Sequence, residues 1–254
     1  MSQRIIWFQH FHKAAGSSVV AAARLNGERF WPSHINGNPT NSAGEQLTLS
    51  SYSKDQLSKF IAQCKELGVT FIATEWALPQ LDALKQDDST IIVTVVRDPL
   101  ARFVSNFYYD LHNGYTTARS IQTYVNSSSR TFTMDNYYCR ILAKLDNRNS
   151  TVTRREFETA KETLAKFDTV VSLEHGFEPM QKALGWTTFA QHENANVSNL
   201  TTLMQRIKGG RFKSAYLQLR YPKRNEKELY SKQFESQFRS DNCWDYQLLK
   251  GLLN

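Results

Sequence analysis

Cysteine is scarce in this sequence, and the cysteines present are not arranged for cross-linking or metal binding. The three residues Cys64, Cys139 and Cys243 lie far apart, are odd in number and include no Cys-x-x-Cys pair. This arrangement argues against a disulfide framework and against a zinc site of the usual spacing. It fits a reducing compartment best, and we expect a cytoplasmic protein.

Long apolar runs are also missing. A membrane-spanning helix would require about 18 consecutive apolar residues, and the sequence has no such run. The first apolar run, "IIWF" at residues 5–8, is too short for the apolar region of a signal peptide. We therefore expect neither a transmembrane helix nor a membrane as partner.

The sequence does have a surplus of positive charge. Lysine and arginine number 31 against 24 aspartate and glutamate residues, which gives a formal net charge of +7. A surplus of this sign favours an anionic partner such as a nucleotide, a nucleic acid, a sulfated glycan or a membrane surface, although solubility alone would also explain it. Composition by itself therefore leaves the partner open.

The alternation of apolar and amphipathic stretches predicts the fold. Short apolar runs predict strands at residues 4–9, 69–74, 89–96 and 168–174. Helical periodicity and capping residues predict helices at 17–25, 54–67, 99–111, 153–167 and 176–185. Strands that alternate with helices predict an α/β fold with a mainly parallel central sheet flanked by helices. No linker divides the chain, so we expect a single domain over residues 1–254.

Three local features refine this prediction. Ser17 or Ser18 is expected to cap the first helix, and Asp98 with Pro99 is expected to open the helix after the third strand. Residues 31–50 are rich in turn formers and polar side chains, so they are expected to form a loop long enough to be functional or mobile.

The stretch "HFHKAAGSS" at residues 10–18 joins the first strand to the first helix. The first N–H groups of a helix lack partners within the helix, and the helix dipole adds partial positive charge there. Small and hydroxylic residues around one lysine complete a candidate anion site: Lys13, Ala14, Ala15, Gly16, Ser17 and Ser18. An ordinary turn with an exposed lysine is the alternative. In the nucleotide-triphosphate loop the lysine follows the glycine, so the order here argues against an ATPase or GTPase.

A second stretch, "VVRDPLARFVS" at residues 95–105, follows the third strand. Arg97 stands at the carboxyl end of that strand, where ligands bind in open α/β sheets, and Ser105 lies two turns into the next helix. An arginine in this place can hold a phosphate by two parallel hydrogen bonds, and a serine can add a donor. The alternative is an arginine paired with Asp98 or another carboxylate.

Together the two stretches resemble the paired signatures of sulfotransferases that use 3′-phosphoadenosine-5′-phosphosulfate (PAPS). The resemblance is greatest to the carbohydrate-type branch, which includes the heparan sulfate sulfotransferases. The first motif of that branch, H-I-P-K-T-[AG]-G-[TS]-[TS], is matched at His10, Lys13, Gly16, Ser17 and Ser18, while His12 replaces the proline. The second, R-D-P-x-x-R-x-x-S, is matched at Arg97, Asp98, Pro99, Arg102 and Ser105. Residues 170–186 and 225–234 resemble later stretches of the branch more weakly.

This resemblance implies a P-loop-like sulfotransferase fold and a sulfuryl transfer from PAPS that leaves adenosine 3′,5′-bisphosphate (PAP). Lys13 and the loop around it would hold the 5′-phosphosulfate and stabilise the leaving phosphate. Arg97 and Ser105 would hold the 3′-phosphate. Preorganised donors of this kind stabilise the charge that grows on a leaving oxygen, so no metal is required.

Three residues are candidates for the base that removes the proton from the acceptor. Glu75 directly follows the second strand and is the preferred candidate, because members of the family use glutamate or histidine as base. His12, beside Lys13, and His34, in the loop at 31–50, are the alternatives. A general base must lie within hydrogen-bond reach of the proton that it abstracts.

The acceptor is hardly defined by the sequence. Five aromatic residues could wall its pocket or belong to the core: Trp31, Trp76, Tyr108, Tyr109 and Tyr115. Residues 208–213, "KGGRFK", could be a basic loop over the cofactor or a solvated turn. We expect a small-molecule acceptor rather than nucleic acid, with a glycan as the alternative. A non-catalytic PAP-binding protein and a kinase are the rival functions.

Overall fold

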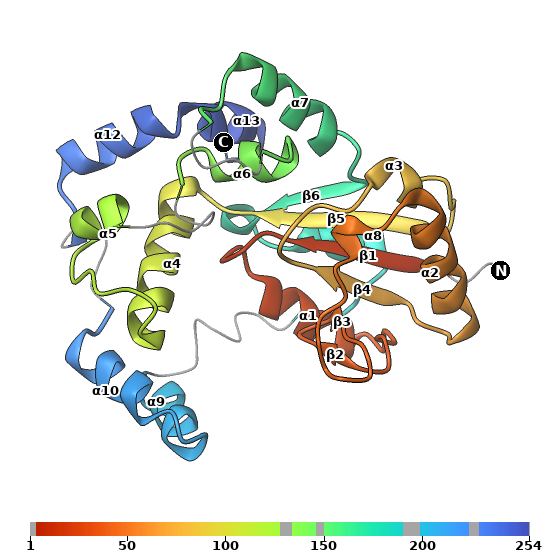
Figure 1. Cartoon of the computed structure of the whole chain (residues 1–254), viewed down its shortest axis with the longest axis horizontal. Coiled ribbons are helices and arrows are strands. Elements are labelled where there is room, and N and C mark those ends of the chain that lie inside the picture. The colour runs from red at the N-terminus through yellow and green to blue at the C-terminus, as the bar shows by residue number, and fades with distance from the viewer. Residues whose placement is uncertain (1–3, 128–133, 146–149, 190–198, 224–228, 254) are drawn as a thin grey trace.

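Four parallel strands form the central sheet of the computed structural model, which describes residues 4–127, 134–145, 150–189, 199–223 and 229–253. The strands pair in the order β4-β1-β5-β6. Their bounds are β1 (Ile5–His10), β4 (Phe71–Thr74), β5 (Thr90–Val96) and β6 (Thr169–Ser172). In this register Trp7 of β1 lies between Ile72 of β4 and Ile92 of β5. The predicted α/β class with a parallel central sheet is confirmed (Figure 1).

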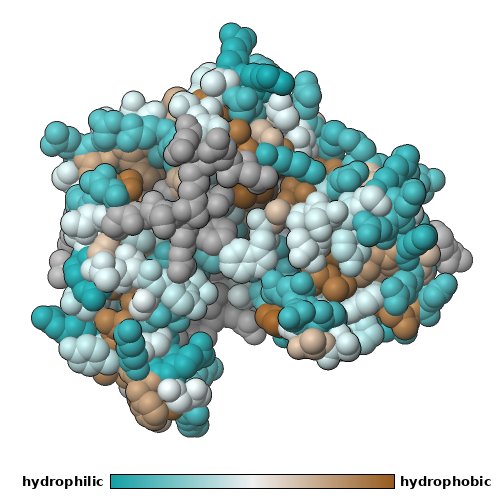
Figure 2. Space-filling view, in the orientation of Figure 1, coloured by the Kyte–Doolittle hydropathy of each residue, from teal (hydrophilic) through white to brown (hydrophobic). Residues whose placement is uncertain are grey.

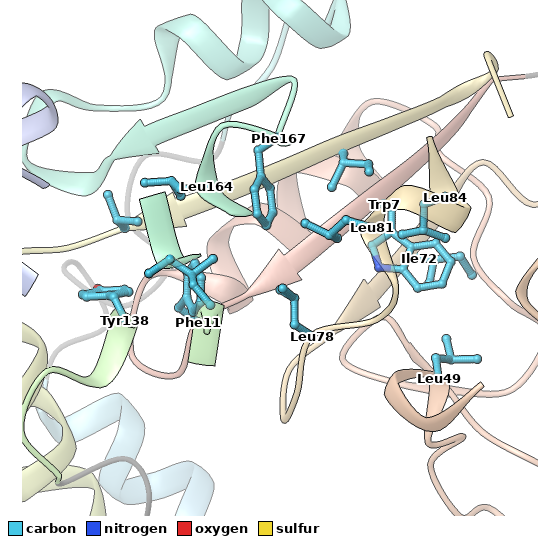
Figure 3. Close-up of a cluster of buried hydrophobic side chains, with 14 of the residues drawn as sticks. Trp7, Phe11, Leu49, Ile72, Leu78, Leu81, Leu84, Tyr138, Leu164 and Phe167 are labelled. Atoms are coloured by element: carbon cyan, nitrogen blue, oxygen red, sulfur yellow. The ribbon is translucent and has the colours of Figure 1, made fainter. Parts of the chain in front are cut away.

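Both faces of the sheet are buried. Because side chains on a strand alternate between its two sides, each face contributes to a different apolar cluster. Ile5 and Trp7 belong to one apolar cluster, while Ile6 and Phe8 belong to another. The second cluster is covered by α1 (Gly16–Leu25) and α8 (Glu178–Leu184). The first is covered by α2 (Lys54–Glu66), α3 (Leu81–Leu84), α6 (Tyr137–Leu142), α7 (Arg154–Leu164) and α13 (Cys243–Leu253). Figure 3 shows part of this larger cluster, with Trp7 beside Leu81 and Leu84.

A third apolar cluster lies beyond the carboxyl ends of the strands. It is built by α4 (Pro99–Asn113), α5 (Ile121–Ser127) and α12 (Lys232–Asp241). Two further helices, α9 (Asn199–Lys208) and α10 (Phe212–Arg220), pack together, and α10 rests on α4. Figure 1 shows this helix pair projecting from the body at the lower left.

The predicted cap of the first helix is wrong. The cap residue is Ala15, with a left-handed backbone (φ 59°), and no side chain caps the helix. The carbonyl of Ala15 accepts the amide hydrogen of Ser18 at 3.0 Å. The chain therefore turns into α1 through backbone geometry, two or three residues earlier than the serines indicated.

The loop predicted at residues 31–50 contains regular structure. A hairpin of β2 (His34–Ile35) and β3 (Asn38–Pro39) turns at Asn36 and Gly37, both with positive φ, and η1 (Leu49–Ser51) follows. Asn-Gly is the preferred pair for such a two-residue turn. The amide of Ala73 in β4 donates to the carbonyl of Gly37 at 3.0 Å, so the hairpin is tied to the sheet.

Other predicted boundaries are confirmed. The Asp98 side chain accepts from the amide of Ala101 at 2.9 Å and caps α4, with Pro99 as its first residue. Residues 209–211 form the turn between α9 and α10, with Gly210 at positive φ. The basic stretch at 208–213 therefore consists of this turn and the helix ends on either side of it. Part of the stretch at 225–234 lies outside the described residues.

Helices α6 and α13 begin against each other, and their contact depends on one buried carboxylate. Asp245 accepts the amide hydrogens of Tyr138 at 3.0 Å and Cys139 at 2.9 Å. In return Asn136 accepts the amide hydrogen of Trp244 at 3.0 Å. Each side chain thus satisfies orphan N–H groups at the start of the other helix. This fixes α6, which carries two tyrosines toward the ends of β1 and β5.

We expect Asp245→Ala to destabilise the fold by about 2–5 kcal/mol, because two buried amides lose a charged acceptor. Urea unfolding followed by circular dichroism measures this loss. Asp245→Asn keeps one acceptor oxygen, so its stability should lie between that of Asp245→Ala and that of the unaltered protein. Asp88→Ala, at an exposed turn, is the matched control and should change stability by less than about 0.5 kcal/mol. Equal stability of Asp245→Ala and Asp88→Ala would contradict the role of the carboxylate.

Candidate functional site

The strand order places a topological switch point between β1 and β5. After β1 the chain adds β4 on one side, then crosses to the other side and adds β5 and β6. Loops leave in opposite directions at such a switch point, and ligands bind there in open α/β sheets. The loop at residues 11–15 follows β1, Arg97 follows β5 and Glu75 follows β4. Parallel pairing therefore brings three of the predicted site segments to one edge.

The loop after β1 is tight and leaves two helical amides open. Lys13 and Ala15 both adopt positive φ, at 65° and 59°. The amide of Ala14 donates to the carbonyl of Phe11 at 3.0 Å, which closes the turn. Within the described part of the chain, the amides of Gly16 and Ser17 at the start of α1 have no hydrogen-bond acceptor. Two N–H groups at the positive end of a helix suit an anion.

Gly16 has a steric role that the sequence did not reveal. A Cβ atom at this position would lie 2.1 Å from Nε2 of His10. The His10 ring also stacks on Phe8, with ring centroids 5.8 Å apart. The imidazole thus fills the space beside the glycine, so Gly16 is required by its neighbour as well as by any close approach of a ligand to the loop.

His12 and Glu75, two competing candidates for the base, are hydrogen-bonded to each other. Nδ1 of His12 lies 2.8 Å from Oε1 of Glu75, and Nδ1 of His10 lies 3.5 Å from the same oxygen. Burial acts to raise the pKa of Glu75, but the hydrogen bonds and charges of His10 and His12 outweigh it and hold the pKa well below its usual range. Burial lowers the pKa of His12, and the hydrogen bond to Glu75 offsets only part of this.

These shifts separate the roles of the pair. An ionised carboxylate can only accept hydrogen bonds, so Nδ1 of His12 must carry the proton that it shares with Glu75. A neutral His12 then bears its lone pair on Nε2, as a general base requires. Glu75 is fitted to orient this imidazole rather than to take a proton itself, because its own pKa is so low. The geometry therefore makes His12 the better proton acceptor of the two, whereas the sequence analysis preferred Glu75 as the base.

His34 is not part of this group. It lies on β2, where Nδ1 accepts the amide hydrogen of Gly37 at 3.2 Å. Its ring stacks on Phe30 with centroids 4.8 Å apart. These contacts give it a place in the hairpin, and in the described residues no hydrogen bond or ion pair connects it with Glu75.

Positive charges gather near Lys13. Burial first, and then the charges of Lys223 and Arg97, lower the pKa of Lys13 to about 8. Partial desolvation and the charges of Arg97 and Arg206 likewise lower the pKa of Lys223. Nζ of Lys13 lies 4.5 Å from the centre of the Tyr109 ring. Cations that depress one another's pKa gain stability from a shared anion, so this cluster is a candidate site for phosphate or sulfate groups.

Arg97 and Ser105 lie on consecutive segments, at the end of β5 and on α4. Asp98 uses its carboxylate to cap α4, and the guanidinium of Arg97 forms no ion pair with any described residue. Ser105 is half-buried on α4, and in the described ranges no hydrogen bond joins it to Arg97. Lys223, in contrast, was missed, because no motif marks a lysine that only the packing of α10 on α4 brings to this edge.

Two tyrosines of α6 hold the loops in place. The amide of His12 donates to the Tyr137 hydroxyl at 2.9 Å. The Tyr138 hydroxyl accepts from the amide of Arg97 at 2.9 Å and donates to its carbonyl at 3.0 Å. Burial raises the pKa of Tyr137 to about 12, so its hydroxyl stays protonated. Tyr138 also packs on Phe11, with centroids 5.1 Å apart, as Figure 3 shows.

Three of the five predicted aromatic residues lie at the site. Trp76 stacks on the His12 ring with centroids 6.3 Å apart, and Tyr109 meets the same ring edge-on at 5.4 Å. Tyr115 lies 6.0 Å from Tyr109. All three side chains are exposed, so they form an open aromatic wall beside the histidine.

The other two aromatic residues belong to the core. Trp31 packs on Phe60, with ring centroids 4.8 Å apart, and Tyr108 is buried in the cluster around α4. The sequence could not separate these two from the three at the site, because their exposure depends on tertiary packing.

Comparison with models of known protein families and with curated proteins finds no match for this chain. Across the described ranges, no three histidine, cysteine, aspartate or glutamate side chains lie so that they could hold a metal ion. In the same ranges no helix is both long and apolar enough to span a membrane. The site therefore has to be interpreted from its own geometry.

We expect Gly16→Ala to destabilise the protein by about 1–3 kcal/mol, because the new methyl group must displace the His10 ring. The displacement should also weaken any anion binding at α1. Thermal unfolding and titration with inorganic sulfate measure the two effects. Gly251→Ala on α13 is the matched control, since its Cβ meets no atom within 4 Å. A Gly16→Ala protein as stable as this control would refute the steric role.

Proposed function

We propose that this protein is a PAPS-dependent sulfotransferase with a P-loop-like fold. It transfers a sulfuryl group from PAPS to a hydroxyl or amine of a small-molecule acceptor in the cytoplasm. One observation carries the proposal: the open amides of α1 and the cation Lys13, whose pKa the charge of Arg97 helps to lower, follow the same strand as His12, which is bonded to Glu75. Anion sites and a base are the two requirements of this reaction.

The two anion sites suit the two ends of PAPS. Lys13 and the amides of Gly16 and Ser17 would hold the 5′-phosphosulfate, in the turn that Ala14, Ala15 and Ser18 complete. Arg97, with Ser105 on the adjacent helix, would hold the 3′-phosphate. Lys223 adds positive charge to the same site, because its charge lowers the pKa of Lys13 and the charge of Arg97 lowers its own pKa. No step in this scheme requires a metal.

The same residues can perform the transfer. A new bond forms between the acceptor oxygen and sulfur while the bond from sulfur to the bridging oxygen breaks. His12 takes the acceptor proton on Nε2, and Glu75 stabilises the imidazolium that results. Lys13 neutralises the charge that develops on the leaving phosphate, which is the largest single contribution to be expected in such a site.

A glycan acceptor is the alternative favoured by one feature, the exposed wall of Trp76, Tyr109 and Tyr115, since the apolar face of a sugar ring can pack on aromatic side chains. A protein that only binds PAP would need the anion sites but not the His12–Glu75 pair. A kinase is disfavoured by the position of the lysine before the glycine of the loop.

PAP should stabilise the fold in the presence of EDTA, and magnesium-ATP should do much less, because only PAP has phosphates for both sites. At about 100 times the Kd, the gain is roughly 2.7 kcal/mol. That corresponds to a rise in Tm on the order of 5–10 °C. Thermal-shift measurements with both ligands test this.

The matching variant is Arg97→Ala, which should lower the affinity for PAP but not for adenosine 5′-monophosphate, which lacks the 3′-phosphate. Arg154→Ala, an exposed arginine on α7, is the control and should leave both affinities unchanged. A large shift with magnesium-ATP and none with PAP would reject the proposed function.

The pH dependence of kcat/KM should reflect the protonation states of His12 and Lys13. Activity should rise as His12 loses its proton, with an apparent pKa below 6.5 because burial lowers it. It should fall again above about pH 8, where Lys13 loses its proton. Removing the negative charge in Glu75→Gln should lower the pKa of His12 further, so the acid limb should move to lower pH.

Both His12→Ala and Glu75→Gln should reduce kcat by roughly 10²–10⁴-fold, with PAP affinity little changed. Rate measurements across pH with a fixed acceptor make the comparison. A crippled Glu75→Gln beside a nearly normal His12→Ala would return the role of base to Glu75.

A further inference from the structure

Almost all of the surplus positive charge of the chain lies in one segment. Residues 199–223 contain six lysine and arginine residues and no aspartate or glutamate, so the rest of the chain carries a net charge of only +1. The segment consists of α9, α10 and the residues that follow them. A single cationic element on an otherwise balanced chain indicates an anionic partner at that place.

The same segment exposes apolar side chains on one face of α10. Phe212, Tyr216 and Leu219 follow the helical spacing i, i+4, i+7, and their exposed fractions are 67%, 63% and 64%. The opposite face is buried where α10 packs on α4 and α9, and it consists of Ser214, Ala215, Leu217 and Gln218. The apolar stripe is therefore not a part of the core, and it needs another explanation.

Basic side chains flank this stripe. Lys213 and Arg220 are exposed on α10, beside the stripe by helical spacing. On α9 the exposed residues include Met204, Ile207 and Lys208. A stripe of large apolar side chains bordered by lysine and arginine is the pattern of helices that lie in the interface of a membrane.

The helix pair is fastened to α4 and projects from the body. The Arg206 guanidinium donates to the carbonyls of His112 at 3.1 Å and Ser214 at 3.2 Å, which fastens α9 to α10 and to the end of α4. Figure 1 shows the pair projecting at the lower left, and Figure 2 shows tan and brown side chains among teal ones there. Its exposed surface is thus preformed and accessible to a flat partner.

We propose that the α9–α10 pair docks this protein on the surface of an anionic lipid bilayer. Phe212, Tyr216 and Leu219 enter the interface, and the flanking lysines and arginines contact anionic headgroups. A second copy of the chain is a poor occupant, because it would bring two strongly cationic segments together. A polyanionic glycan would pair with the charges but would leave the aliphatic side chains in water.

This docking does not depend on the proposed function. It departs from the expectation of no membrane partner, which rested on the lack of a spanning segment. A surface helix needs only one apolar face, and that face is interrupted in the sequence by polar residues. The absence of long apolar runs therefore has no bearing on it.

Flotation of the full-length protein with lipid vesicles tests the proposal. We expect binding to phosphatidylcholine vesicles that contain about one quarter phosphatidylserine, weakening with added salt, and little binding to phosphatidylcholine alone. Phe212→Ser/Leu219→Ser should lower the partition coefficient by roughly tenfold or more. Lys208→Gln/Lys213→Gln should lower it for anionic vesicles only.

Matched controls lie elsewhere on the surface. Leu25→Ser removes a leucine that is 58% exposed at the end of α1, and Lys59→Gln removes an exposed lysine on α2. Both should bind as the unaltered protein does, and thermal melts should show every variant folded. The proposal is overturned if anionic vesicles do not bind or if Leu25→Ser matches the double apolar variant. It is equally overturned if heparin binds while vesicles do not, which would identify a glycan site.

Discussion

The parallel pairing of β1 between β4 and β5 is the constraint on which the site depends. Because these three strands run the same way, their carboxyl ends meet at one edge, and each delivers a different chemical group there. Glu75 follows β4, His12 and Lys13 follow β1, and Arg97 follows β5. The strand order places the change of direction between β1 and β5, so loops diverge where the cations converge.

A second constraint comes from the far end of the chain. Asp245 on α13 holds the start of α6, and α6 places Tyr137 and Tyr138 against the backbone of His12 and Arg97. If the proposed transfer takes place here, the loop must stay within a fraction of an ångström of its working geometry, and supporting hydrogen bonds of this kind provide such precision. The site is thus positioned by residues more than a hundred positions away from the loop that it uses.

The electrostatics of the site follow from burial as much as from contacts. Lys13 is half-buried beside other cations, while Glu75 is kept ionised by two histidines. A bound dianion would relieve the repulsion between Lys13 and the neighbouring cations. It would leave the contacts of Glu75 with the two histidines intact. The arrangement separates a place for negative charge from a place for a proton, which is what the proposed transfer of a sulfuryl group to a hydroxyl would require.

Much of the fold could be predicted because it depends on local patterns. The apolar runs predicted the four strands of the central sheet, and Asp98 with Pro99 predicted the start of α4. The cap at Ala15 and the hairpin at Asn36–Gly37 were missed. The cap depends on a left-handed backbone at Ala15, which the side-chain types do not indicate. The hairpin was missed because the surrounding residues are polar turn formers without the apolar pattern of strands.

By itself the sequence determined which residues could carry the chemistry: a lysine in a small-residue loop, an arginine at a strand end, and three candidate bases. Only the tertiary structure decided how they relate. It bonded His12 to Glu75, brought Lys223 to Lys13 and turned the apolar face of α10 to solvent. The reason is physical: spacing along a chain sets which face or edge a residue occupies, but distances between residues far apart in sequence, and the pKa shifts that those distances cause, exist only after packing.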